Sequence, residues 1–538
     1  MKKINIACII FSVLMASGCY KDKGNYDYTD IKRVEIQFDK ISSYTITQGD
    51  VLEVNPIYPD FVLANPDNYE FTWYLNDETR PEWNTMNFKW QINDLMERGN
   101  LVIEVRDKST DVKYMNRATV TVNGVYTNYY SWMILSDDGG KSKLSFLSVN
   151  ALLDPDSADQ PQGSDQYYYD GERFITNVYN GDLGSGPIAL QEHWREGIDY
   201  SETVIGNVCV FQKSGAVDLE GTGFTKEIDM VDAFVGQKYP ASNTVLYPGS
   251  FIQYADVVCD QDGKLYSRLK LSDNVYNSEY FLQSPLKVRG EEEVLENCRV
   301  CRGYYTSNRF GYQVVYDGKN KRFLYFQDGG SSWDTPAEGA SAIVPVKVDS
   351  KLYLEDVVHL DNHNGYELLH LCQSAATGAG WNSYYGFYEV LREEATDKLF
   401  LQQFILTKKY GADSPDIQSI TKKEIKGLPG IPSVMAFPTY NPTEYAFFAI
   451  GKKLYMVDLV NMSDAELYYE FDSDITAMDY GSSSNIHLAV GLEDGSFFVL
   501  GANAAKNIKD EHKLVYKAPE KVGKIVDIKY KNNSMWNY

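Results

Sequence analysis

The sequence contains few cysteines, which excludes a fold held together by disulfides. Only 7 cysteines occur in 538 residues, whereas small secreted domains that depend on disulfides are much denser in cysteine. Two of them lie within the first twenty residues. The other five are Cys209, Cys259, Cys298, Cys301 and Cys372. This odd set cannot all pair within one chain. Five cysteines in a chain of this length are also too few to replace a hydrophobic core, so the fold must depend on one.

Basic residues are also scarce relative to acidic ones. The chain carries 51 Lys and Arg against 75 Asp and Glu, which gives a formal net charge of −24. A phosphate backbone is bound through clustered Lys and Arg, and an acidic field of this size repels it. We therefore expect no nucleic-acid partner. The acidity is consistent with the solubility of an exported protein.

The apolar run at the N-terminus is too short to cross a membrane. It spans about a dozen residues, 4–15, whereas a transmembrane helix needs roughly 20. Lys2 and Lys3 precede it, and the small residues Ala16-Ser17-Gly18 lead directly into Cys19. This order is typical of a bacterial lipoprotein signal. We predict a signal peptide over 1–18 and a lipid on Cys19, with a plain secretory signal and a membrane anchor as the weaker alternatives.

Long helical patterns are rare in the rest of the chain. Aromatic residues make up 14% of it, including 42 tyrosines, and this composition favours an all-β fold. The length exceeds that of one ordinary domain. We predict a polar lipidated tether over 19–30, a small β-sandwich over 31–124, and a large β domain over 125–538.

The first predicted domain contains several strand signals with period two. Such strands suit an Ig-like sandwich, whose two sheets bury alternate side chains. Trp73 is the expected core aromatic, and residues 93–98 are expected to form one helical turn. The predicted strands are 34–38, 51–54, 69–75, 101–105 and 118–122.

Two short segments of this region carry a family resemblance. The segment 19–28, Cys-Tyr-Lys-Asp-Lys-Gly-Asn-Tyr-Asp-Tyr, and the segment 71–76, Phe-Thr-Trp-Tyr-Leu-Asn, resemble the PKD-like lipoproteins of Bacteroidetes. The resemblance covers about residues 1–125. It implies a PKD-like domain first, an outer-membrane location facing the cell exterior, and a gene beside a SusC/SusD-type importer. It supplies no catalytic residue that can be placed on this chain.

After Gly124 the pattern changes to short strands separated by polar turns rich in Gly and Asp. Seven hairpins recur at a spacing on the order of 40 to 80 residues, near or above the length of a propeller blade. This repetition predicts a seven-bladed β-propeller, which leaves only short sheet edges exposed. Stacked sandwiches are the alternative, because the spacing is irregular and no WD or kelch signature recurs. The hairpins pair 132–135 with 143–147, 208–211 with 216–219, 252–258 with 264–266, 311–316 with 322–326, 384–391 with 398–401, 445–450 with 453–457, and 486–490 with 497–500.

One cluster of histidines resembles a candidate metal site. His359, His363 and His370 lie close to Glu367 in the sequence, but the spacing lacks the HExxH pattern, in which two ligands share one helix face. Residues 357–360 have the pattern of a strand. We therefore predict no metal ligands, and expect these histidines at polar turns or strand edges.

Two other patterns suggest cofactors only weakly. Acidic residues gather at 137–140 and 154–159, but neither segment has EF-hand spacing, and Asp and Gly favour tight turns in any case. We predict no cofactor, with bound calcium as the alternative. Cys298 and Cys301 form a CxxC motif without a second CxxC or a nearby histidine, so we expect strand residues instead of a zinc or redox site.

No catalytic motif is present, and we predict no catalytic residue. The chain has no GxSxG elbow and no Cys/His signature, although the two carboxylates of a glycosidase could come from distant strands without a motif. Aromatic residues between the predicted strands are the candidate ligand or partner contacts, because exposed Trp and Tyr combine apolar area with a polar edge. Alternatively, these aromatic residues cover the hydrophobic core beneath the loops. The candidates are Trp333, Trp381, Tyr384, Tyr385, Trp194 and Tyr168.

Together these patterns predict an accessory binding subunit of a SusC/SusD-type importer. It would work beside the transporter and companion lipoproteins and capture an oligopeptide or an oligosaccharide. A lipid on Cys19 would hold the binding surface near the transporter, so that weak contacts become effective. Two alternatives remain open, namely a surface hydrolase acting on glycans or peptides, and an adhesin or envelope scaffold.

Overall fold

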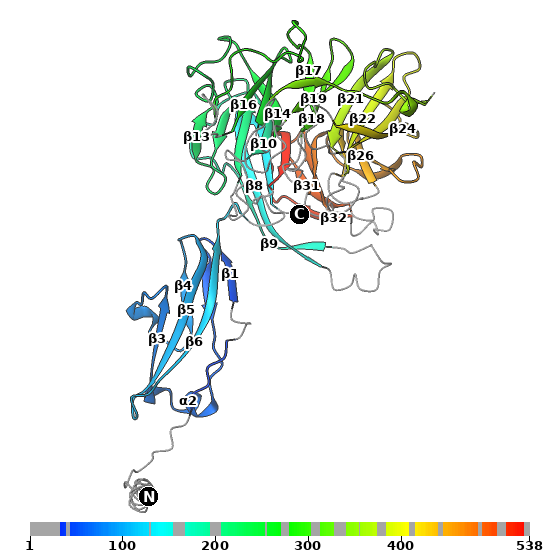
Figure 1. Ribbon diagram of the computed structural model, residues 1–538. Helices are drawn as coiled ribbons and strands as arrows, with labels where there is room; N and C mark the ends of the chain where they lie inside the picture. The colour runs from blue at the N-terminus through cyan, green and yellow to red at the C-terminus, as the bar shows by residue number, and fades with distance from the viewer. Residues whose placement is uncertain are drawn as a thin grey trace, which may run out of the picture. The chain divides into compact units, whose positions relative to one another are not determined.

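The chain divides into two compact units, residues 1–123 and 124–538. The sequence placed this boundary one residue later. The architecture comes from a computed structural model, shown in Figure 1. The residues that it describes are 33–38, 43–127, 131–153, 167–193, 206–252, 255–270, 279–302, 312–327, 341–354, 356–373, 384–407, 415–438, 445–481, 487–502 and 513–531.

Strands dominate both units, which confirms the all-β class predicted from the sequence. Within the described ranges the only α-helix is the five-residue α2 (Asp60–Ala64), accompanied by single 3-10 turns. The described part of the chain has no helix with the length and apolar character needed to span a bilayer.

The first unit consists of two small sheets. One has the strand order β1-β6-β5-β3, and the other pairs β2 with β4. β1 runs parallel to β6, while the other ladders are antiparallel. The strands are β1 (Ser43–Thr47), β2 (Val51–Val54), β3 (Tyr69–Leu75), β4 (Phe88–Gln91), β5 (Met96–Asp107) and β6 (Lys113–Asn123).

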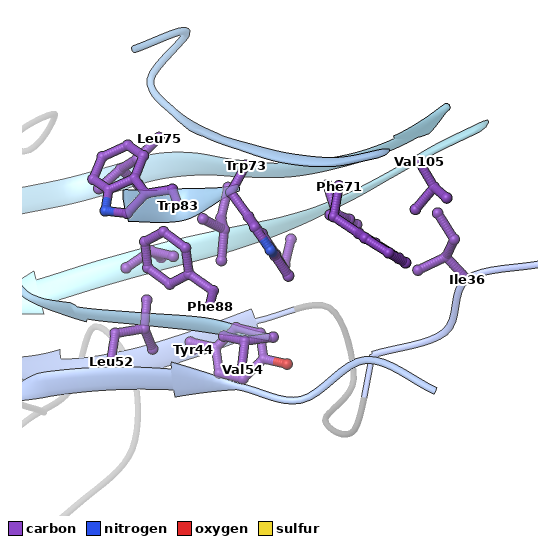
Figure 2. Close-up of a cluster of buried hydrophobic side chains, with 14 of the residues drawn as sticks. Ile36, Tyr44, Leu52, Val54, Phe71, Trp73, Leu75, Trp83, Phe88 and Val105 are labelled. Carbon is purple, nitrogen blue, oxygen red and sulfur yellow. The ribbon is translucent and has the colours of Figure 1, made fainter. Parts of the chain in front are cut away.

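A single hydrophobic cluster fills the first unit, and Figure 2 shows its aromatic centre. Phe71, Trp73 and Leu75 alternate along β3 and all point inward. Trp73 is fully buried, its ring centroid lies 5.3 Å from that of Phe88, and its Nε1–H donates to the carbonyl of Thr85 at 2.9 Å. Because the indole N–H keeps a partner, this burial leaves no unsatisfied donor. Trp73 is therefore the core aromatic that the sequence predicted.

Two local predictions for the first unit were wrong. Residues 93–98 form no helical turn, because Met96 already belongs to β5 and pairs with Val122 of β6. Residues 34–38 form no strand, and only Gln37 makes an isolated bridge, to Ile57. The alternating apolar residues of that segment still enter the core, which explains why the pattern resembled a strand.

The second unit contains seven antiparallel sheets that follow one another along the chain. The first sheet, in the order β33-β7-β8-β9, combines strands from the two ends of the unit. They are β33 (Lys524–Tyr530), β7 (Trp132–Asp138), β8 (Lys141–Leu153) and β9 (Tyr167–Ile175). The strand nearest the C-terminus, red in Figure 1, thus completes a sheet whose other strands are cyan.

The other six sheets are each built from consecutive strands. The second sheet contains β10 to β13 (Pro187–His193, Asn207–Gln212, Val217–Leu219, Lys226–Asp229), and the third contains β14 to β16 (Leu246–Phe251, Ala255–Asp260, Leu265–Leu269). The fourth contains β17 to β20 (Cys298–Val300, Tyr312–Asp317, Arg322–Gln327, Ile343–Pro345), and the fifth contains β21 to β24 (Tyr366–Gln373, Tyr384–Glu393, Leu399–Thr407, Asp416–Ile425). The sixth contains β25 to β28 (Val434–Ala436, Tyr445–Ile450, Lys453–Asp458, Glu466–Glu470), and the seventh contains β29 to β32 (Ile475–Tyr480, His487–Leu492, Phe497–Gly501, Leu514–Lys517).

Hydrophobic packing links each sheet of the second unit to the next. Six clusters join the first sheet to the second and so on to the seventh, and one more joins the seventh sheet back to the first. Along β30, Leu488 and Val490 pack toward the sixth sheet, whereas Ala489 packs toward the first. Because successive side chains of a strand point to opposite faces, both faces of such a sheet are buried.

All seven hairpins predicted from the sequence occur, and each supplies two adjacent strands of one sheet. They correspond to the ladders β7 with β8, β11 with β12, β15 with β16, β18 with β19, β22 with β23, β26 with β27, and β30 with β31. The strands that flank them are often short, such as the three-residue β17 and β25, and these escaped prediction.

Candidate binding cleft

A cleft of about 710 Å³ lies in the second unit, at one edge of the third, fourth and fifth sheets. Three chain segments supply most of its lining, namely the turn 260–263 after β15, the segment 297–302 that contains β17, and the start of β21 at 366–368. Residues of β14, β15 and β18 and of the turns that follow β18 and β22 complete it. The cleft thus combines residues that are more than a hundred positions apart in the sequence.

The turn at 260–263 is held rigidly in place. The carboxylate of Asp260 accepts hydrogen bonds from the backbone N–H groups of Asp262 and Lys264, each at 2.9 Å. Gly263 has φ +71°, and a Cβ at this position would lie 2.5 Å from the backbone nitrogen of Cys298. Only glycine allows so close an approach in this backbone conformation. The turn therefore fixes one wall of the cleft against β17.

Three tyrosines line the cleft, namely Tyr247, Tyr316 and Tyr366. Burial, with a further contribution from Glu389, raises the pKa of Tyr316 to about 12, so its hydroxyl stays protonated at neutral pH. The hydroxyl of Tyr366 donates to Glu393 at 3.2 Å. Tyrosines of this kind offer a flat apolar face and a polar edge to a ligand.

Ion pairs hold several charged side chains of the cleft. Lys321 pairs with Glu394 at 2.9 Å, and Arg392 pairs with the lining residue Glu367 at 2.5 Å. Both pairs are partly exposed, so each contributes little to stability, about 0–1 kcal/mol. Their effect is to fix the positions of the carboxylates.

A polar network extends from the cleft to β33 in the first sheet. Arg302 donates to Asp527 at 3.3 Å, and the same carboxylate oxygen accepts the backbone N–H of Leu190 at 2.8 Å. Lys529, also on β33, donates to Asp479 of β29 at 3.0 Å. These contacts join β33 of the first sheet to β10 of the second, to β29 of the seventh, and to Arg302, which lies two residues beyond β17 of the fourth.

His370 of β21 lies near this network and stacks on Phe437, with ring centroids 5.4 Å apart. Burial lowers its pKa to about 4, and the positive charges of Arg302, Lys529 and Arg299 contribute to the same shift. His370 is therefore neutral at physiological pH.

The predicted histidine cluster is dispersed in the structure. His359 is exposed and stacks on Tyr353 with ring centroids 3.7 Å apart, whereas His363 is fully buried with Nε2 2.9 Å from a carboxylate oxygen of Glu389. Residues 357–360 do not form the strand that the sequence predicted, and only His359 makes an isolated bridge, to Asn362. Among the described residues, no group of three or more His, Cys, Asp and Glu side chains could hold a metal ion.

The two cysteines of the CxxC motif point into different parts of the core. Cys298 belongs to β17 and packs between the third and fourth sheets, while Cys301, just beyond the strand, packs between the fourth and fifth. Both are free thiols, and burial raises the pKa of each well above its usual range. Buried thiols of this kind are poor nucleophiles and poor metal ligands.

Several candidate residues from the sequence analysis lie outside the described residues. Trp194, Trp333, Trp381, Cys19 and the segment 154–159 lie outside the described ranges.

Three of the tyrosines expected between strands in fact lie on strands. Tyr168 belongs to β9 opposite Leu152, and Tyr384 and Tyr385 begin β22. At Tyr168 strand pairing extends farther than the hydrophobic pattern indicated, whereas Tyr384 and Tyr385 lie in the strand that the hairpin pattern predicted over 384–391.

The acidic segment 137–140 is a hairpin turn between β7 and β8. The carboxylate of Asp137 accepts the backbone N–H of Gly140 at 2.6 Å. Gly139 and Gly140 both have positive φ angles, of 60° and 91°. Turn geometry therefore accounts for the Asp and Gly residues of this segment.

Sequence reasoning missed the cleft itself. Arg299 and Arg302 lie within the segment that contains the CxxC motif, which drew attention only to its cysteines. The Asp-Gly sequence at 262–263 is a hairpin-turn signal. It was the local sequence signal that coincided with part of the cleft lining.

Comparison with known proteins supports the PKD-like resemblance. The model of the PKD-like family matches residues 19–179, which extend from the N-terminal region through the first unit to β9 of the second. No curated protein matches the chain.

Three solved structures cover most of the chain at low identity. A quinonprotein alcohol dehydrogenase-like protein from Bacteroides thetaiotaomicron is 11% identical, with 92% of this chain and 97% of that chain covered and a TM-score of 0.35. The apo form of AztD from Citrobacter koseri is 11% identical, with coverages of 86% and 97% and a TM-score of 0.35. BamB from Moraxella catarrhalis is 10% identical, with coverages of 74% and 88% and a TM-score of 0.31.

Proposed function

We propose that the second unit is a seven-bladed β-propeller that binds a ligand without chemical turnover. Support for the architecture comes from the chain's own sheets. Seven sheets follow in order, a hydrophobic cluster joins each to the next and the last to the first, and the last strand completes the first sheet. Closure of this kind leaves only short sheet edges exposed.

The observation that carries the binding function is the cleft beside Tyr247, Tyr316 and Tyr366. It is concave, it is lined by aromatic and charged side chains, and one of its walls is fixed by the hydrogen-bonded turn 260–263. Binding sites in proteins typically combine a largely pre-formed concavity with a small number of placed polar groups. An oligopeptide or an oligosaccharide suits such a lining, since both present apolar faces and polar edges to tyrosine.

The proposed location and partner come from the N-terminal sequence. We propose that Cys19 carries a lipid, that the protein lies on the outer membrane facing the cell exterior, and that it acts beside a SusC/SusD-type importer and companion lipoproteins. Tethering would raise the effective concentration of the cleft near the transporter, so moderate affinity for the ligand is sufficient.

Ligand binding is tested by titrating the lipid-free protein with oligopeptide and oligosaccharide mixtures and measuring the dissociation constants. We expect Tyr247→Ala and Tyr366→Ala each to weaken binding about tenfold, as for aromatic contacts near the centre of an interface. The matched control is Tyr280→Ala, because Tyr280 is 42% exposed in the same unit but does not line the cleft. Equal affinities for all variants would contradict the proposed site, and turnover of a ligand would support the hydrolase alternative.

The partner is tested by purifying the protein from outer membranes of the native host. We expect the wild-type protein to co-purify with an importer, and Cys19→Ala to appear in the soluble fraction without it. A wild-type protein that co-purifies with no transporter would refute this partner and leave ligand binding by the cleft unaffected.

A further inference from the structure

Four carboxylates line the cleft among the described residues, and three of them have close partners within the protein, whereas Asp262 lies 3.6 Å from Lys264 and is 59% exposed. Glu394 pairs with Lys321, and Glu367 pairs with Arg392. The carboxylate of Asp260 accepts backbone N–H groups of its own turn and the hydroxyl of Tyr266 at 3.1 Å. These acidic groups therefore have reduced capacity to bind a cationic or hydroxyl-rich ligand.

Arg299 differs from the other charged groups of the cleft. Its Nη1–H donates to the backbone carbonyl of Leu368 at 2.7 Å, and among the described residues no carboxylate pairs with it. The residue remains exposed. A guanidinium has five N–H donors, so one bond to a carbonyl leaves most of them for a ligand. The bond to Leu368 also holds the side chain across the gap between the fourth and fifth sheets.

The surroundings of Arg299 add positive charge and an aromatic residue. Arg302 lies three residues further on, and its side chain keeps 39% exposure despite its contact with Asp527. Tyr316 also lines the cleft, and it pairs directly with Arg299 in the ladder between β17 and β18. The cleft thus holds Arg299, Arg302 and Lys321 beside its carboxylates, on a chain with a net charge of −24.

We propose that Arg299 binds a carboxylate group of the ligand, with Arg302 as a second cation in the lining of the cleft. This inference rests on the proposed binding function and narrows it to acidic ligands. Arginine matches a carboxylate through two parallel N–H···O bonds, which lysine cannot make. The carboxylate could belong to an oligopeptide or to a uronic-acid oligosaccharide, and the cleft recognises the group common to both.

The test compares each ligand mixture with a form whose carboxylates have been neutralised. One arm uses a protein digest before and after amidation of its carboxyl groups, and the other uses oligogalacturonides before and after methyl esterification. Binding to the full-length lipid-free protein is measured for wild type, Arg299→Gln and Arg299→Lys. Gln removes the positive charge while keeping a polar N–H donor, although its shorter side chain gives up the bond to the carbonyl of Leu368. The control is Arg117→Gln, an exposed arginine of β6 in the first unit.

We expect wild type to bind the acidic form of at least one mixture tenfold or more better than the neutral form. Arg299→Gln should abolish that preference without changing affinity for the neutral form, Arg299→Lys should retain part of it, and Arg117→Gln should retain all of it. The arm that shows the preference identifies the source of the carboxylate.

Two other outcomes overturn the inference and are distinguishable. If wild type binds acidic and neutral forms equally, or if Arg299→Gln weakens both equally, carboxylate recognition is wrong while the binding function stands. If neither mixture binds in any form, the proposed function fails and this inference fails with it.

Discussion

The two units differ in how their sheets bury hydrophobic side chains. The first unit buries one face of each small sheet in a single cluster centred on Trp73, Trp83 and Phe88. The second unit buries both faces of its sheets in seven separate clusters, and leaves polar groups such as Asp527 and Lys529 where the first strands meet. The difference shows why ligand chemistry is expected in the second unit, because its packing leaves charged side chains in a concave site.

The largest effect should come from breaking the packing that joins the last sheet to the first. Ile528 of β33 is fully buried in that cluster, and Ile528→Asp would place an unpaired charge there at a cost of about 4 kcal/mol or more. We expect the second unit to lose its cooperative thermal transition in calorimetry of the full chain, while the first unit keeps its own.

A matched control lies on the same strand. Lys524 is exposed and pairs with Glu493, so Lys524→Ala should change stability by less than about 0.5 kcal/mol. If Ile528→Asp leaves the thermal transition of the second unit unchanged, the closed arrangement of seven sheets is wrong.

The second largest effect should be confined to the first unit. Trp73→Ala removes a fully buried ring and should cost about 3–5 kcal/mol. Calorimetry should show only the transition of the first unit moving, with ligand affinity unchanged. Met115→Ala is the control, since Met115 is 61% exposed on the same unit. A loss of ligand binding in Trp73→Ala would contradict the separation of roles between the units.

A smaller effect should follow from adding a methyl group to the wall of the cleft. Gly263→Ala combines a positive φ with a contact of 2.5 Å to the backbone nitrogen of Cys298, so we expect a loss of about 1–3 kcal/mol and weaker ligand binding. Gly290→Ala has a similar φ of +87° but open space around the new methyl. Chemical denaturation of both variants separates the effect of the close contact from the effect of the positive φ. Equal losses of stability would mean that contact with β17 has no part in fixing the turn.

The smallest effect is a pH dependence of stability. The pKa of His370 is lowered to about 4 in the folded protein, below the usual value of about 6.5. Between these values the unfolded chain takes up a proton that the folded chain does not, so stability falls as the pH drops below about 6.5.

His370→Gln should remove this contribution. The loss of stability between pH 7 and pH 5.5, measured by denaturant titration, should be smaller in the variant by about 1 kcal/mol. Identical pH profiles for the variant and wild type would show that His370 titrates normally.

The sequence predicted the repeated hairpins well because their signal is local. Alternating apolar residues and turns such as Asp317-Gly318 mark both strands and the turn between them. The flanking strands carry no comparable signal, since β17 has only three residues, and its boundaries depend on pairing with β18. Residues 93–98 were misassigned for the same reason, because the register with β6 outweighs the local helical pattern.

The cleft could not be predicted from the sequence because its residues meet only after folding. Tyr247, Arg299 and Tyr366 come from three different sheets, and no spacing in the sequence connects them. The aromatic segments that the sequence favoured are locally rich in Trp and Tyr, but local richness does not indicate which side chains converge. Concave sites of this kind are a property of topology more than of composition.

Hydrogen exchange of the full chain with and without a bound acidic ligand mixture tests the central claim most directly. The account predicts that the ligand slows exchange in the segments 260–263, 297–302 and 366–368, which line the cleft, and that Arg299→Gln removes this protection. Protection confined to the first unit, or identical protection in Arg299→Gln, would contradict the account.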